Sequence, residues 1–295
     1  MVERIAKELH TPLLRPLPQG VPHKILSIDM GIRNLALCHF QPPPSSSVPV
    51  KITGWERLAV CERPDPSSPT DSESFAPIDL AAKAYTLIKQ SLEKYDPHTI
   101  LIERQRYRSS GGTSILEWTL RVNMLEAMFH AVLYSLSEQR VHPNFVVHSV
   151  SPRSVTQFWL ADIEEKLNSR QTKLAKIEVA KDIIAGKRMP IEFLEKSNEV
   201  AKGFSVRSSG EKKLDDLADS LLQGLAWLQW DTNRKTTFTE IMSTDEGPRG
   251  KKTLQQNAST RIRSRVTESD MSTESDTKSA KKNPTVRRKK LPELF

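Results

Sequence analysis

The chain has 295 residues, of which 37% are hydrophobic and 27% charged, so it can bury one sizeable core and still leave a long polar remainder. It contains no long apolar run of the kind that spans a membrane, and its two cysteines offer neither a disulfide framework nor metal-ligand spacing. The net charge of +8 is concentrated at the end of the chain, where the residues from Thr232 onward hold 15 Lys and Arg against 8 Asp and Glu. The body before Thr232 is almost neutral, so charge alone does not identify a nucleic-acid-binding protein.

The first strand signal is the apolar stretch ILSIDMGIRNLALC, which follows Lys24 and carries Asp29. Before it lie a short helical segment, VERIAKEL, and a Pro-rich linker, and we assign residues 1–23 to a separate N-terminal segment. A second strand is predicted over 52–60. It follows the loop QPPPSSSVP, whose turn-forming residues favour a hairpin between the two strands.

Helices and strands alternate in the middle of the chain. Residues 79–95 have the spacing of an amphipathic helix, with Asp79 as the predicted N-cap and Pro97 as the stop. The short strand HTILIE follows and ends at Glu103. A basic loop over 104–113 then leads to the next helix.

In the second half of the chain, apolar spacing and helix-start signals predict five further elements: a helix over 115–137, a strand over 145–149, a helix from Ser151, an exposed Lys-rich helix over 169–187 and an amphipathic helix over 214–230. Strands that alternate with helices after an initial hairpin predict a mixed α/β sheet covered by helices. We therefore assign one main domain to residues 24–231. Residues 232–295 have little apolar periodicity and are predicted to form a disordered basic tail.

Acidic residues occur in three separate segments. Asp29 lies in the first strand and Glu103 ends a later one, while the last helix begins with Asp215, Asp216 and Asp219. Either pair that includes Asp219 lies on one helix face, because the spacings are three and four residues. A lone Asp before a glycine is more often a turn residue, but carboxylates that gather within about 4 to 6 Å need a cation to offset their repulsion. Mg²⁺ takes oxygen ligands, and two such ions stabilise the attacking and leaving oxygens of phosphodiester hydrolysis.

Basic residues surround two of these acidic segments. Three arginines and one aromatic residue follow Glu103 directly, namely Arg104, Arg106, Tyr107 and Arg108. Arginines contact phosphates and an aromatic ring stacks on an unpaired base, so we expect this loop to contact DNA, with a solvated basic face as the alternative. Lys212 and Lys213 precede the last helix and are predicted to stabilise phosphate charge.

The segments IDMGIRN, LIERQRYRS with EWTLRVNMLEAM, and KKLDDLADSLLQGLAWLQW closely resemble the fungal mitochondrial Holliday junction resolvases. That family belongs with the bacterial RuvC-type resolvases in the ribonuclease H-like superfamily, and the resemblance covers roughly Ile25 to Trp230. It implies a ribonuclease H-like mixed sheet of five strands, the first three antiparallel. It also implies a homodimer that resolves four-way DNA junctions by paired symmetric nicks.

Carried over to this chain, the resemblance implies a metal site formed by Asp29, Glu103, Asp215 and Asp219. It would hold two Mg²⁺ ions, for which Mn²⁺ is expected to substitute. Asp216 is the alternative to Asp215, because the bacterial relatives space their last two acids three residues apart and the fungal pattern favours four. The resemblance further implies mitochondrial residence. VERIAKEL resembles the last helix of the family's SAP-type DNA-binding module, and this acidic-containing start is not a convincing transit peptide.

Three other functions share parts of this pattern. An actin-like or sugar-kinase ATPase would need Gly-rich phosphate loops that the sequence lacks. A protein that binds junctions without cutting them would be expected to have lost an acid, yet all of them are present. A ribonuclease H that acts on RNA–DNA hybrids would share the acids but not the RQRYRS and EWTLRVNMLE segments.

Overall fold

The computed structural model describes residues 17, 21–42, 48–61, 75–105, 116–142, 145–163, 165–194, 196–206 and 214–243, and in the last range it describes side chains as far as residue 237. None of the helices in these ranges is both long and apolar enough to cross a membrane. The predictions for the N-terminal helical segment and for the basic tail from residue 244 onward fall outside the described residues.

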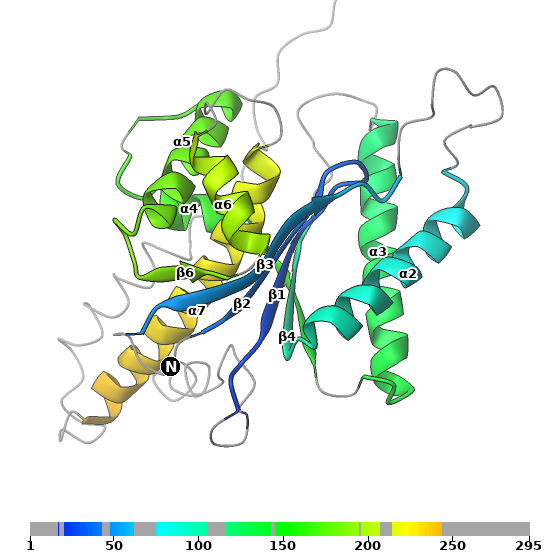
Figure 1. The fold of residues 1–295 in the computed structure, drawn as a ribbon, viewed down its shortest axis with the longest axis horizontal. Helices are drawn as coiled ribbons and strands as arrows, with labels where there is room; N and C mark the ends of the chain where they lie inside the picture. Colours follow the sequence, from blue (N-terminus) through cyan, green and yellow to red (C-terminus); the bar gives the residue numbers. More distant parts are fainter. Residues whose placement is uncertain are drawn as a thin grey trace, which may run out of the picture. The chain divides into compact units, whose positions relative to one another are not determined.

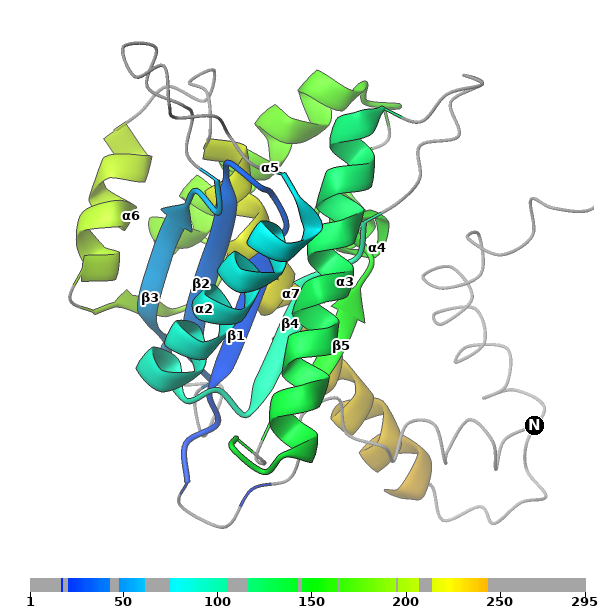
Figure 2. The same ribbon diagram turned by 90° about the vertical axis from the view of Figure 1, so that its right-hand side faces the viewer.

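A mixed sheet of six strands lies at the centre of the fold, in the order β5-β4-β1-β2-β3-β6 (Figure 2). The strands are β1 (Ile25–Asp29), β2 (Leu35–Gln41), β3 (Val50–Leu58), β4 (Thr99–Glu103), β5 (Val146–Val150) and β6 (Ile191–Phe193). The first three are antiparallel, as predicted, and the last three each join the sheet through a parallel pairing. The resemblance implied five strands, and the structure corrects this number to six, because the three-residue strand β6 pairs with β3 at the edge of the sheet.

Helices cover both faces of the sheet (Figure 1). The helices α2 (Pro77–Tyr95) and α3 (Glu117–Glu138) lie on one face, and α4 (Pro152–Trp159), α5 (Ser169–Ile184), α6 (Lys196–Val206) and α7 (Leu214–Ser243) lie on the other. Each face has its own hydrophobic core because strand side chains alternate between faces. The central strand β1 is buried along its whole length, which explains the apolar side chains of Ile25, Leu26 and Ile28 on both of its faces.

The opening apolar stretch forms two strands instead of one. A tight turn over 30–34 separates β1 from β2, and residue Asp29 is therefore the last residue of its strand. A side chain on Gly31 would bring its Cβ to 3.0 Å from the carbonyl oxygen of Asn34, so the turn requires glycine there. The turn places the Asp29 carboxylate at an end of the sheet, where other elements can reach it.

Several predicted helices differ in their ends or their environment. Helix α2 begins at Pro77 with Ala76 as its N-cap, so the prediction of Asp79 as N-cap is wrong. The Lys-rich helix α5 begins with a capping box at Asn168, and it is not simply exposed, since it buries an apolar face against α7. Helix α6 had no clear periodic signal and was not predicted. Ser151 caps α4 as expected, through its side-chain oxygen.

The last helix is longer than its predicted range of 214–230. It continues to Ser243, so the prediction of disorder from Thr232 onward is wrong for its first twelve residues. Asp231 is buried, and Lys235 lies one turn after it along the helix. The ion pair between the two side chains, 2.6 Å long, stabilises this extension. Helix α7 packs closely on β1 and β2, and a Cβ on Gly224 would lie 2.2 Å from the ring of Phe40. Glycine at this position lets the helix approach the sheet.

Candidate active site

The predicted acids come together at one end of the sheet. Strands β1 and β4 are parallel neighbours whose register pairs Ile28 with Ile102, so Asp29 and Glu103 follow side by side. The first two turns of α7 carry the remaining acids beside these strand ends. We call Asp29, Glu103, Asp215, Asp216 and Asp219 the carboxylate site.

Asp29 is the most buried acid of the carboxylate site, with 7% of its surface exposed. Burial raises its pKa well above the ordinary range, and the nearby charges of Glu103, Asp219 and Asp216 raise it further. A side-chain hydrogen bond between Asp29 and Glu103 also raises the pKa of Asp29. The structure therefore places four of the five predicted acids close enough to act on one another through Asp29.

The other two members of this group on α7 are also difficult to ionise. Burial raises the pKa of Asp219 to about 6, although the charge of Lys176 opposes the rise. Burial and the repulsion of Asp215 raise the pKa of Asp216 to about 6, and Arg57 on β3 opposes that rise. Burial is thus the largest cause of all three raised pKa values, and the negative charges of neighbouring acids add to it.

Asp215 has a different environment. Burial by itself would raise its pKa, but a hydrogen bond and the charge of Lys173 lower the pKa below its ordinary value. The Lys173 Nζ atom lies 2.5 Å from a carboxylate oxygen of Asp215. Asp215 is thus held by α5, whereas Asp216 and Asp219 are the α7 acids whose charge acts on Asp29.

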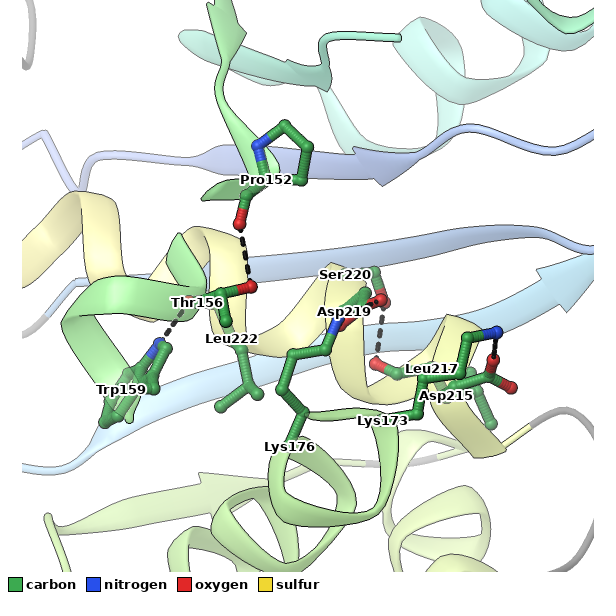
Figure 3. A network of polar contacts seen from close by, with 10 residues as sticks. All are labelled: Pro152, Thr156, Trp159, Lys173, Lys176, Asp215, Leu217, Asp219, Ser220 and Leu222. Carbon is green, nitrogen blue, oxygen red and sulfur yellow. Dashed lines mark hydrogen bonds and ion pairs between the residues drawn. The ribbon is translucent and has the colours of Figure 1, made fainter. Parts of the chain in front are cut away.

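Two lysines of the site were missed by the sequence interpretation. Lys173 and Lys176 lie one turn apart on α5 and extend toward Asp215 and Asp219 respectively (Figure 3). The Lys176 Nζ atom is 2.5 Å from Asp219, and the lysine side chain is only 12% exposed. A buried lysine needs an anionic partner, so this pair is a feature of the site instead of a surface contact. The signal in the sequence was present only as two lysines spaced for one helix face.

The donor set suits a hard divalent cation. The acids offer oxygen ligands from three separate elements, and burial together with like-charged neighbours raises the pKa values of Asp29, Asp216 and Asp219. Within the described residues, no three His, Cys, Asp or Glu side chains already converge as metal ligands. Ammonium groups of α5 contact two of the acids, Asp215 and Asp219.

A small cavity opens beside these acids. It is lined by side chains of β4, α4, α5 and α7, namely Glu103, Pro152, Val155, Thr156, Lys176, Asp219 and Gln223. The cavity thus brings two acids of the carboxylate site together with a lysine and a buried amide.

The chain matches the family described as "Mitochondrial resolvase Ydc2 / RNA splicing MRS1" over residues 25–237. The protein belongs to this family. The matched range contains every acid of the carboxylate site as well as Lys173 and Lys176.

Two curated relatives of this resolvase family carry the name "Cruciform cutting endonuclease 1, mitochondrial". The protein from Schizosaccharomyces pombe is 33% identical over 216 residues, which cover 72% of this chain and 80% of the relative. The protein from Saccharomyces cerevisiae is 26% identical over 260 residues, which cover 74% of this chain and 71% of the relative. Both matches agree with the resemblance found in the sequence motifs.

The solved structure of the yeast mitochondrial Holliday junction resolvase Ydc2 has a similar fold. The two structures superpose with a TM-score of 0.58 at 27% sequence identity, and the match covers 80% of this chain and 90% of Ydc2. The predicted ribonuclease H-like resolvase fold is thus confirmed, with the sixth strand as the correction noted above.

Most of the predicted DNA-contacting residues of this family member lie outside the described ranges, namely Arg106, Tyr107, Arg108, Lys212 and Lys213. Arg104 is described, and its backbone N–H donates to the carbonyl oxygen of Val150 at 2.8 Å. The next backbone N–H, that of Gln105, donates to a carboxylate oxygen of Glu126 at 3.0 Å. These two bonds tie the start of the basic loop to β5 and to α3.

Proposed function

We propose that this protein is a structure-specific DNA endonuclease that resolves four-way junctions by paired symmetric nicks. The observation that carries this proposal is the convergence of Asp29, Glu103, Asp216 and Asp219 at one end of the sheet. The curated relatives are named for cutting cruciforms, and the solved relative is named a Holliday junction resolvase. The reaction is hydrolysis of a phosphodiester bond.

Divalent metal ions accompany the RuvC-like resolvase fold, and we assign two Mg²⁺ ions to the carboxylate site, with Mn²⁺ able to replace them. Bound metal supplies an activated water and stabilises charge on the reacting phosphate. Asp29 and Glu103 hold their positions through adjacent strands, and Asp219 faces them from α7. If Asp219 bound a cation, the ammonium group of Lys176 would be free to contact a phosphate oxygen, and Lys173 would be free in the same way if Asp215 were the ligand.

Asp215 and Asp216 compete for the last ligand position. The four-residue spacing of the fungal pattern favours Asp215 with Asp219. The charge of Asp216 acts directly on Asp29, whereas Asp215 is paired with Lys173, and this electrostatic arrangement favours Asp216. Asp215→Asn and Asp216→Asn, compared for Mn²⁺ affinity without DNA, decide between them, since only the ligand's variant weakens binding strongly.

We also propose that the protein works as a homodimer, since symmetric nicks need two active sites related by a two-fold axis. The exposed side of α3 supports this assembly. Four exposed residues form a stripe along this side, at successive spacings of seven, four and three residues: Leu120, Ala127, Ala131 and Tyr134. Among the apolar residues of this helix, Leu125 is buried in the core, whereas Leu120 is 47% exposed and Trp118 is also exposed.

The mitochondrion is the proposed location, because both curated relatives are named mitochondrial. We propose that the resolvase domain begins near residue 24 and that the segment before it is related to the SAP-type DNA-binding module. That the ring of Tyr107 stacks on an unpaired base of the junction stays a prediction. If Tyr107→Ala left junction binding, junction distortion and cleavage at wild-type levels, this role would be dropped.

The competing function is nucleic-acid binding without cleavage, because the family description also names an RNA splicing protein. The intact carboxylate site argues against it, as a binding protein has no need for five acids that repel one another. A ribonuclease H that acts on RNA–DNA hybrids is the third candidate.

The deciding experiment presents a synthetic mobile four-way junction, a linear duplex, an RNA–DNA hybrid and a flap, each with and without Mg²⁺. We expect paired nicks in the junction alone, and only with the metal. Binding of the junction without nicks would support the non-cleaving alternative. Cleavage of the hybrid in preference to the junction would support the ribonuclease H.

A further inference from the structure

We propose that Gln223 is a positioning residue that sets the register of α7 against β1 and β4 and so holds Asp219 beside the acids of those strands. The proposal rests on the proposed function of the carboxylate site, which it deepens. Gln223 is 3% exposed, a rare degree of burial for a polar amide.

The contacts of Gln223 reach both acid-bearing strands. Its Nε2 atom lies 3.1 Å from the hydroxyl oxygen of Ser27, 3.2 Å from the carbonyl oxygen of Ile28 and 3.4 Å from the carbonyl oxygen of Leu101. The amide nitrogen has two hydrogens, which it donates to the two nearer acceptors on β1. Its contact with the carbonyl oxygen on β4 is longer and weaker. One side chain thus joins both strands to the last helix.

The spacing along each element relates these contacts to the acids. Ser27 is two residues before Asp29 on β1, so both side chains lie on the same face of the strand. Leu101 is likewise two residues before Glu103 on β4. Gln223 is four residues after Asp219, one turn along α7. The amide therefore lies one layer below the carboxylate site on all three elements.

The rest of the helix face shows why such a contact matters. Near Gln223, α7 packs through Leu221, Leu222 and Leu225 and through the close approach at Gly224. Apolar packing is non-directional, whereas metal ligands must be held to within about 0.5 Å. Trp55 of β3 and Trp159 of α4 also donate to the backbone of α7, but they join it to other elements. The Gln223 amide supplies the directional contact to the two strands that carry acids.

The test replaces Gln223 with methionine, which has a similar length and no donor. For Gln223→Met we expect an unchanged junction affinity and a single-turnover nicking rate at least about 10-fold lower, since small misplacements of reacting groups cost up to about 100-fold. The Mg²⁺ concentration for half-maximal nicking rises several-fold. Mn²⁺ binding without DNA, measured by calorimetry, weakens in parallel.

Two further variants control this experiment. Ser220→Ala is the matched control, because Ser220 is fully buried on the same helix and its hydroxyl donates only one turn back, to the carbonyl oxygen of Leu217. It should nick and bind metal like the wild type. Ser27→Ala removes one acceptor of the amide and should shift rate and metal affinity in the same direction as Gln223→Met, by less. This milder variant decides the question if Gln223→Met does not fold.

The outcomes separate this proposal from the function on which it rests. If the wild type nicks junctions and Gln223→Met nicks them at the same rate and with the same metal dependence, the role of Gln223 is overturned and the proposed function stands. An equal loss in Ser220→Ala also overturns this role, because the effect would then be general destabilisation of α7. If the wild type does not nick junctions, the proposed function fails, and undiminished Mn²⁺ binding by Gln223→Met would then overturn the positioning role independently.

Discussion

Replacement of Asp216 by asparagine should stabilise the metal-free protein. Burial and the charge of Asp215 raise the pKa of Asp216 from an ordinary value of 3.8 to about 6. Because the folded chain holds this proton more tightly than the unfolded chain, wild-type stability falls as the pH rises from about 4 to about 6. Asparagine mimics the protonated acid and removes that loss.

The size of the gain follows from the two pKa values. The difference between 3.8 and about 6 corresponds to about 3 kcal/mol at neutral pH. Solvent reaches part of this carboxylate, so we expect about 2 kcal/mol to be recovered, or a rise in melting temperature of about 4 to 8 °C for a domain of this size. The gain should shrink toward zero near pH 4, where the unfolded chain also becomes protonated.

Thermal unfolding followed by circular dichroism in a chelating buffer, across this pH range, tests the prediction. Asp182→Asn is the matched control, because the pKa of the exposed Asp182 is lowered by its hydrogen bond to Lys187, so its removal should bring no gain. Addition of Mg²⁺ should narrow the difference between Asp216→Asn and the wild type. A gain of the same size at both ends of the pH range, or no gain at neutral pH, would refute the electrostatic reasoning.

Three further predictions concern the site and the packing beneath it. Asp29→Asn and Glu103→Gln should abolish Mg²⁺-dependent nicking while band-shift assays show nearly unchanged junction binding, and full activity in either variant would exclude the two-metal assignment. Lys176→Met leaves the partly exposed Asp219 without its ion pair, so we expect a loss of about 1 to 3 kcal/mol in chemical unfolding at neutral pH without metal, and a smaller loss near pH 4 where Asp219 is protonated. Gly224→Ala should lower the melting temperature clearly, because its Cβ would overlap the ring of Phe40; an unchanged melting temperature would show that α7 shifts freely on the sheet.

Local signals in the sequence were sufficient for most of the fold. The apolar runs that became β1 and β4 and the 3.6-residue periodicity of α2, α3 and α7 are properties of short segments, so they can be recognised without knowledge of their neighbours. The errors have a common physical cause. Strand β6 exists because it pairs with β3, and the extension of α7 to Ser243 follows a buried Asp231 that only the folded chain reveals.

The sequence by itself determined the chemical character of the site: oxygen ligands from three segments, in an order that identifies a resolvase family. Only the tertiary structure decided which groups surround those oxygens. Lys176 reaches Asp219 from 43 residues earlier in the sequence, and the Gln223 amide meets β1, which lies nearly 200 residues earlier in the chain. Such contacts leave no periodic trace, because they depend on how α5 and α7 pack on the sheet and not on the local preferences of either segment.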